Sequence, residues 1–376
     1  MTRFAFLAAA SIFLAACAGG SGAPLSTAAP TRAPAIAFRT PTPTSTPLPF
    51  TAPEAVPPLT LDDVFGSPAA REALKLDPAK LRTIVATGDV IPGRRVDQQI
   101  RLRGNDFAYP LSGTADILRQ ADLTVINLEA PLIEGCPPQE EGLTFCGQPG
   151  FAGALADAGV DVATLENNHI GNFGQEGIDA TEDLLTVEGI AWADAFTPAV
   201  HEVRGLRFAF VAFNGVGGSF DRELIQRQIA AVREQADVVV AAFHWGAEYV
   251  AIPQAAPGIA ADNPVEIAHL AADVGADLII GNHPHWVQAV EVYKGKLIAY
   301  AHGNFILDQM WSRETTIGVI GRYTFYETKL VDADFLSVVI ENSARPRPLE
   351  GAEAQAVLDG MRQASVSLRD LLASTP

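Results

Sequence analysis

The stretch Leu278-Ile-Ile-Gly-Asn-His-Pro-His285 joins an unbroken apolar run to three polar side chains. Residues 278–281 are too uniformly apolar for a half-exposed strand and are typical of a strand in a sheet that is covered on both faces. Asn282, His283 and His285 follow directly. Because ligands of open α/β sheets bind beyond the carboxyl ends of the strands, this stretch predicts both the fold class and the position of a functional site.

The same order of apolar run and polar residue recurs along the chain. The predicted strands are Leu81–Thr87, Leu123–Asn127, Val160–Leu165, Val238–Phe243, Leu278–Gly281 and Leu297–Ala301. The predicted helices are Gly113–Gln120, Phe151–Ala158, Gln175–Glu188, Arg222–Gln235 and Pro264–Val274. Two pairs, Arg204-Gly205 and Lys294-Gly295, each separate two apolar runs and predict hairpins. The sequence therefore predicts a layered α/β domain with mixed rather than purely parallel sheets.

Further polar residues lie just beyond the predicted strands, and we expect their side chains to converge. They are Asp89, Glu129, Asn167, Asn168, His169, His244, His302, Asn304 and Asp308. Imidazole, carboxylate and amide donors without a thiolate suit Zn, Mn or Fe. Pro284 favours an extended backbone at His283, which directs the rings of His283 and His285 to the same side. The pattern predicts a divalent metal site with one or two ions.

The start of the chain has the pattern of an exported protein. The apolar stretch from Phe4 to Ala16 is too short to span a bilayer but fits the core of a secretory signal. Residues 1–16 are predicted to be a lipoprotein signal peptide, because Leu14-Ala15-Ala16-Cys17 resembles a bacterial lipobox in which Cys17 becomes lipidated. The alternative is an ordinary signal peptide. Residues 17–58 are rich in Pro, Thr and Ala and predict an extended linker. The interpretation is an extracytoplasmic, membrane-anchored bacterial lipoprotein.

The remaining cysteines, Cys136 and Cys146, enclose a short loop rich in Pro, Gly and Glu. In an oxidising compartment they are expected to form a disulfide, which contributes about 2–3 kcal/mol through loop-closure entropy. The alternative is two free thiols.

Charge and composition exclude two classes of protein. The 376 residues include 26 Lys and Arg against 44 Asp and Glu, a net charge of −18. This acidity excludes a nucleic-acid-binding protein, which needs a basic face for phosphates. A hydrophobic content of 48% excludes intrinsic disorder over most of the length. The negative charge belongs to residues 59–376, because residues 1–58 are slightly basic.

Six short segments are specific in combination. They are Thr87-Gly-Asp-Val-Ile-Pro-Gly-Arg94, Asn127-Leu-Glu-Ala-Pro131, Asn167-Asn-His169, His244-Trp-Gly246, Gly281-Asn-His-Pro-His285 and Gly303-Asn-Phe305. In this order they resemble the CapA family of poly-γ-glutamate capsule synthesis proteins, which are similar to calcineurin-like metallophosphoesterases. The resemblance implies a metallophosphoesterase-like four-layer α-β-β-α sandwich with mixed sheets over residues 59–345. An apolar pattern in residues 346–376 predicts a C-terminal helical tail that packs on the domain or meets a partner.

The resemblance also implies roles for the site residues. Asp89 and His285 bind one metal, Glu129 bridges, and the second metal is bound by Asn168, His244 and His283. His169 is implied to be the general acid or the transition-state stabiliser. Two residues depart from the phosphoesterase pattern. Ile91 occupies the position of a usual histidine ligand, so the first metal site is expected to be weak, water-completed or empty. Glu129 occupies the position of an aspartate, so the metal–metal distance is expected to differ.

Three functions remain open. The favoured hypothesis is a metal-dependent enzyme that acts on the γ-glutamyl amide bonds of an anionic polymer, with Arg94, and less securely Arg95, contacting the substrate. The alternatives are a metal-dependent phosphoesterase and a non-catalytic accessory or export subunit of a membrane polymer synthase. An anionic substrate also predicts a locally positive site around the metals and Arg94. Trp245 is either an apolar wall of this site or a buried structural residue.

Overall fold

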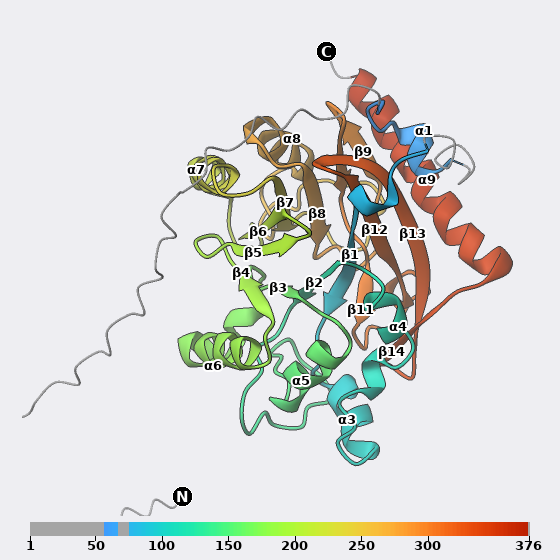
Figure 1. Ribbon diagram of the computed structural model, residues 1–376. Helices are drawn as coiled ribbons and strands as arrows, with labels where there is room; N and C mark the ends of the chain where they lie inside the picture. The colour runs from blue at the N-terminus through green and yellow to red at the C-terminus, as the bar shows by residue number, and fades with distance from the viewer. Residues whose placement is uncertain (1–55, 67–74, 375–376) are drawn as a thin grey trace, which may run out of the picture. The chain divides into compact units, whose positions relative to one another are not determined.

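The computed structural model describes residues 56–66 and 75–374 (Figure 1). The predicted signal peptide, Cys17 and nearly all of the predicted linker lie outside these residues. Within the described ranges, no helix has both the length and the apolar composition needed to cross a membrane.

The first sheet is built around β1, whose last residues include Asp89. Parallel strands β2, β3 and β4 continue the sheet on one side of β1, and antiparallel strands β12, β13 and β14 continue it on the other. The short strand β11 pairs in parallel with the end of β1, where Asp89 lies opposite Asn304. The bounds are β1 Leu81–Val90, β2 Leu123–Leu128, β3 Val162–Thr164, β4 Ala191–Ala193, β11 Asn304–Ile306, β12 Ile317–Tyr326, β13 Lys329–Glu341 and β14 Arg345–Pro348.

The second sheet has the strand order β5-β6-β7-β8-β10-β9, with antiparallel pairs at its two edges and parallel pairs between them. The edge pairs are hairpins that turn at Arg204-Gly205 and Lys294-Gly295, as predicted. All four turn residues have positive φ, as a two-residue type I′ hairpin requires. The bounds are β5 Ala199–Val203, β6 Leu206–Asn214, β7 Val238–His244, β8 Leu278–Asn282, β9 Val290–Tyr293 and β10 Lys296–Ala299.

Most of the helices cover the outer faces of the two sheets, whereas α1 and α9 pack against the edge strand β9 and against β13 (Figure 1). The α-helices are α1 Leu61–Val64, α3 Arg95–Leu102, α4 Ala115–Leu118, α5 Gly150–Asp157, α6 Gly174–Val187, α7 Arg222–Arg233, α8 Pro264–Val274 and α9 Gly351–Ser374. Short 3-10 helices lie at Pro78–Lys80, Tyr109–Leu111, Ile170–Phe173 and Glu314–Thr316. Helix α4 is shorter than the helix predicted over residues 113–120.

Three apolar clusters define the layers. Side chains such as Ile84 of β1 and Phe208 of β6 meet between the two sheets. Alternate residues of the first sheet, such as Val85, pack against α3, α4, α5 and α6, and alternate residues of the second sheet pack against α7 and α8. The order helix, sheet, sheet, helix confirms the predicted four-layer α-β-β-α sandwich with mixed sheets. Strands such as β7 and β8 are buried at every residue, which explains their unbroken apolar sequences.

Helix α9 packs on the domain and extends the apolar core. Met361 joins the cluster between the sheets, and Leu368 joins the cluster on the outer face of the second sheet. The Ser365 Oγ accepts a hydrogen bond of 2.9 Å from the Val290 backbone N–H at the start of β9. The sequence left open whether the C-terminal helix packs on the domain or meets a partner, and in the structure it packs on the domain.

Candidate metal centre

The carboxyl ends of strands from both sheets meet at one cluster of polar side chains. Asp89 lies near the end of β1, Glu129 follows β2, and Asn168 lies beyond β3. From the second sheet, His244 is the last residue of β7, and His283 and His285 follow β8. The donors form two groups, and within each group the ligand atoms lie within 4.8 Å of one another. The first group is Asp89, Glu129 and His244, and the second is Glu129, His283 and His285. Glu129 is common to both groups.

Several donors at this cluster are buried without a hydrogen-bond partner. They are Asp89 Oδ2, Glu129 Oε1 and both ring nitrogens of His283. An unsatisfied buried polar atom costs about 1–3 kcal/mol. A divalent ion coordinated by imidazole nitrogen and carboxylate oxygen removes this cost, so the residues fit a metal site. These buried groups can therefore hold a metal ion.

Asn127 and Asn167 orient the carboxylates. The Asn127 side-chain N–H donates to Asp89 Oδ1 at 2.8 Å and to Glu129 Oε2 at 3.4 Å. Its Oδ1 accepts a hydrogen bond of 3.1 Å from the Asn167 side chain. The Asn167 Oδ1 in turn accepts from the backbone N–H groups of His169 and Ile170. Asn167 was expected to converge on this site, whereas the orienting role of Asn127 was not predicted.

Asn304 determines which nitrogen of His285 is free. The Asn304 side-chain N–H donates to Gln309 Oε1 at 3.1 Å and to the Thr315 carbonyl at 2.9 Å, so its Oδ1 faces His285. His285 Nδ1 lies 2.9 Å from that oxygen and donates to it. This hydrogen bond leaves Nε2 of His285 free for a metal, the arrangement found around most ligating histidines.

The buried ionisable groups of this cluster shift one another's pKa values. Burial acts to raise the pKa of Asp89, but His285, with Nδ1 only 3.1 Å from Asp89 Oδ2, outweighs it and the pKa falls to about 2. Burial acts to lower the pKa of His285, but Asp89 raises it to about 9. Burial and the charge of Asp89 raise the pKa of Glu129 well above its ordinary value. Burial lowers the pKa of His244 to about 3, which keeps this ring neutral and able to bind metal.

The backbone of the His-Pro-His segment differs from the prediction. His283 has φ +97° and His285 has φ +57°, so the expectation of an extended backbone at His283 is wrong. The chain turns sharply after β8, and the Tyr249 N–H holds the turn through a hydrogen bond of 2.9 Å to the Pro284 carbonyl. The two rings still lie close together, with centroids 5.8 Å apart. Strained backbone of this kind is common at functional sites.

His169 lies beside the cluster and is held by Asn172, three residues later, and by Phe145 of the preceding loop. Its Nδ1 is 3.2 Å from Asn172 Oδ1, which also accepts a hydrogen bond of 2.6 Å from the Phe145 N–H. The Phe145 ring packs edge-on against the imidazole at 4.5 Å between centroids. Burial lowers the pKa of His169 to about 4, so the ring is neutral at pH 7.

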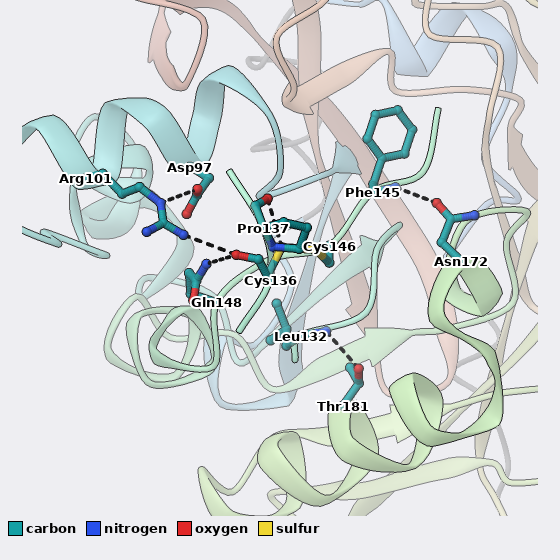
Figure 2. The surroundings of a disulfide bond; sticks show 10 residues. All are labelled: Asp97, Arg101, Leu132, Cys136, Pro137, Phe145, Cys146, Gln148, Asn172 and Thr181. Atoms are coloured by element: carbon teal, nitrogen blue, oxygen red, sulfur yellow. Dashed lines mark hydrogen bonds and ion pairs between the residues drawn. A yellow bond between two sulfur atoms is a disulfide. The ribbon is translucent and has the colours of Figure 1, made fainter. Parts of the chain in front are cut away.

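Cys136 and Cys146 form a disulfide at the base of that loop (Figure 2). Figure 2 shows Arg101 and Gln148 donating to the Cys136 carbonyl, at 3.3 and 2.9 Å. Because Phe145 is the neighbour of Cys146, the disulfide and these hydrogen bonds restrain the ring that contacts His169.

Arg94 is engaged within the protein. It forms an ion pair with Asp308, donates to the Gly142 carbonyl at 3.0 Å and lies over the Phe145 ring, and its side chain is 11% exposed. Arg95 is exposed and borders a cavity of about 400 Å³ with Trp311, which is 62% exposed. Arg94 is therefore engaged by Asp308 and the Gly142 carbonyl, and its contact with an anionic substrate stays a prediction.

The other residues weighed in the sequence analysis have structural positions. Trp245 is fully buried, stacks on Phe243 and donates to the Tyr300 carbonyl at 2.9 Å. His302 is buried with Nε2 2.6 Å from the Tyr323 hydroxyl and belongs to neither donor group. Ile91 is buried in an apolar cluster with Ala130, Phe145 and Leu307, so no donor replaces the usual histidine at that position.

Comparison with known proteins places this site in a family. The family model described as bacterial capsule synthesis protein PGA_cap matches residues 83–309. The chain is 26% identical over 298 residues to the capsule biosynthesis protein CapA of Bacillus anthracis, covering 72% of this chain and 70% of that protein. It is 28% identical over 249 residues to the PGA biosynthesis protein CapA of Bacillus subtilis (strain 168), covering 60% of this chain and 63% of that protein.

Among solved structures, a hypothetical protein from Thermus thermophilus is similar with 17% identity and a TM-score of 0.45, covering 68% of this chain and 98% of that chain.

The match to the family model extends over more than half of the chain and confirms the resemblance seen in the six motifs. The chain belongs to the bacterial capsule synthesis protein family PGA_cap.

Proposed function

We propose that this protein acts in poly-γ-glutamate biosynthesis at the bacterial cell envelope, as a metal-dependent enzyme on γ-glutamyl amide bonds. The two CapA relatives are named for capsule or PGA biosynthesis, which supports poly-γ-glutamate as the polymer on which this protein acts. The two donor groups that share Glu129 support one or two bound ions of Mn, Zn or Fe.

The observation that carries the proposal is the set of unpaired buried donors. A module that only binds a polymer has no need to keep Asp89 Oδ2, Glu129 Oε1 and both nitrogens of His283 buried without a hydrogen bond. Such an arrangement is costly without a ligand and favourable with a divalent ion between the donors. We assign Asp89, Glu129, Asn168, His244, His283 and His285 as the residues that hold it.

A bound divalent metal supplies two kinds of chemistry, since it acidifies a coordinated water and polarises a carbonyl or phosphoryl oxygen. The protein supplies orientation and proton transfer. Asn127 and Asn304 fix the acidic and imidazole donors. The Nδ1–H of His169 donates to Asn172, which leaves Nε2 to accept a proton and to return it to the leaving amine.

The envelope location rests on the start of the chain. We propose that Cys17 carries a lipid and that residues 17–58 hold the domain away from the membrane as a linker. Radiolabelled fatty acid is expected on the wild type and absent from Cys17→Ser, and equal labelling of both chains would contradict the lipid anchor.

A non-catalytic accessory or export role at a membrane polymer synthase is the second candidate. The observation in its favour is that Arg94, the cation expected to contact an anionic polymer, is paired with Asp308. A metal-dependent phosphoesterase remains the third candidate, and the same assay separates all three.

The test is turnover by the full-length chain with added Mn²⁺ or Zn²⁺, on poly-γ-glutamate and on an aryl phosphate. Cleavage or transfer of poly-γ-glutamate that is abolished in His169→Ala and His283→Ala supports the proposal. The matched control is His201→Ala, which removes a histidine on β5 outside both donor groups. Activity that survives in the two site variants would overturn the assigned site. Activity only on the aryl phosphate would favour the phosphoesterase, and inactivity on both would favour the accessory role.

A further inference from the structure

Glu248 is an acidic residue at the centre for which the sequence analysis predicted no role. It lies in the loop His244-Trp-Gly-Ala-Glu248 that follows β7. Its Oε1 is 3.9 Å from Nε2 of His283, a buried nitrogen without a hydrogen-bond partner. The Glu248 side chain is 35% exposed, whereas His283 is 1% exposed. Glu248 therefore approaches the buried donors from the side open to solvent.

The loop that carries Glu248 is anchored on both sides of this residue. The Ala247 N–H donates to the Gln254 carbonyl at 2.9 Å, and the Tyr249 N–H donates to the Pro284 carbonyl at 2.9 Å. The second of these bonds joins the loop to the turn between His283 and His285. The main chain of Glu248 is thus held against the same turn that supplies the two imidazoles.

The donor group that contains His283 has three members. Glu129, His283 and His285 offer one carboxylate and two imidazoles. A fourth donor would complete the tetrahedral set of two imidazoles and two carboxylates that divalent zinc accepts.

The distance is close to what coordination requires. Two ligand atoms at about 2.1 Å from a tetrahedral ion lie about 3.4 Å apart. The observed 3.9 Å between Glu248 Oε1 and His283 Nε2 exceeds this by about half an ångström. Glu248 lies outside the two donor groups, so its side chain must rotate toward the centre to coordinate an ion, and its partial exposure permits such a rotation.

We propose that Glu248 is a further carboxylate ligand of the metal centre, adjacent to His283. The inference rests on the metal centre of the proposed function, but it does not depend on the substrate or on catalysis. It predicts that metal affinity itself depends on the charge of Glu248.

The experiment is a competition titration of Zn²⁺ and of Mn²⁺ against a chromophoric chelator, with full-length wild type, Glu248→Gln and Glu202→Gln. The control, Glu202, is an exposed residue of β5, so its substitution removes the same charge away from the centre. We expect Glu248→Gln to bind at least 10-fold more weakly and Glu202→Gln to match the wild type. Glu248→Asp keeps a carboxylate and is expected to recover part of the affinity.

The possible failures are distinguishable. Equal affinity of wild type and Glu248→Gln, or an equal loss in Glu248→Gln and Glu202→Gln, would overturn the ligand role of Glu248 and leave the metal centre intact. Equal loss in Glu248→Gln and Glu248→Asp would also overturn it. No binding by the wild type would overturn both the metal centre and this inference.

Discussion

Removal of the Cys136–Cys146 disulfide is expected to lower the stability of the domain by an amount that the loop size determines. The two cysteines are separated by 10 positions in sequence, so the bond closes a small loop. In the chain-entropy treatment a loop of about 11 residues contributes about 3 kcal/mol at 25 °C. Both cysteines are buried, so alanine is the replacement that adds no unpaired polar atom.

The expected shift in melting temperature follows from the size of the protein. Unfolding entropy is about 2.1 cal/mol/K per residue, or about 0.6 kcal/mol/K for a domain of about 300 residues. A loss of about 3 kcal/mol then lowers the midpoint by about 4–5 °C. The loop should also open locally, because Phe145 next to Cys146 would lose the covalent restraint and be held only by noncovalent contacts such as those with His169 and Asn172.

The assay is thermal unfolding followed by circular dichroism, with and without the reductant TCEP. Cys136→Ala/Cys146→Ala should melt about 4–5 °C below the oxidised wild type and should not respond to TCEP. The wild type in TCEP should move toward the variant. Hydrogen exchange should be faster in residues 136–148 of the variant. An unchanged midpoint together with unchanged exchange would refute the reasoning that the disulfide restrains this loop.

Two further predictions concern a close backbone approach and the pH dependence of metal binding. Gly281→Ala should destabilise the domain by more than about 2 kcal/mol in urea unfolding, because the added Cβ would lie 2.1 Å from the Tyr300 carbonyl oxygen. Gly171→Ala is the control, since its Cβ meets no atom within 4 Å, and equal stability of the two variants would contradict the packing argument. Metal affinity should increase from pH 6 to pH 9. Burial lowers the pKa of His285, but Asp89 raises it to about 9, so the ring is protonated at neutral pH and loses that proton as metal binds. Affinity independent of pH in this range would exclude His285 as a ligand.

The elements that could be predicted from sequence are those with a strong local pattern. Strands β7 and β8 read as unbroken apolar runs because both faces of each sheet are covered. The hairpins were predictable because Arg204-Gly205 and Lys294-Gly295 permit positive φ at both turn positions. These signals depend only on neighbouring residues.

Other elements lacked such a pattern. The long antiparallel pair β12 and β13 was not predicted, because polar residues such as Asp332 and Asp334 interrupt the apolar sequence of β13 on its less buried positions. Helix α3 and the short strand β11 were also not predicted. Strand β11 consists of only three residues, Asn304–Ile306, and exists because it pairs with the end of β1.

Some features of the candidate site could likewise be predicted from the sequence, and others could not. Its donor types and their places after strands follow from sequence, since parallel strands direct their carboxyl ends to one edge. The partners of each donor do not. Arg94 and Asp308 are 214 positions apart, and their ion pair changes Arg94 from an expected substrate contact into an engaged side chain. Asn304 selects the free nitrogen of His285 through a contact between two separate turns.

The sequence by itself determined the layered α/β architecture, the family motifs and the set of nitrogen and oxygen donors, because periodicity and side-chain chemistry are local properties. The tertiary structure decided that Glu129 is shared by two donor groups and that Glu248 lies beside His283. It also decided that Arg94 pairs with Asp308. The physical reason is that distance, burial and paired charge arise only when strands from two sheets pack together, and no neighbouring residue in the sequence encodes them.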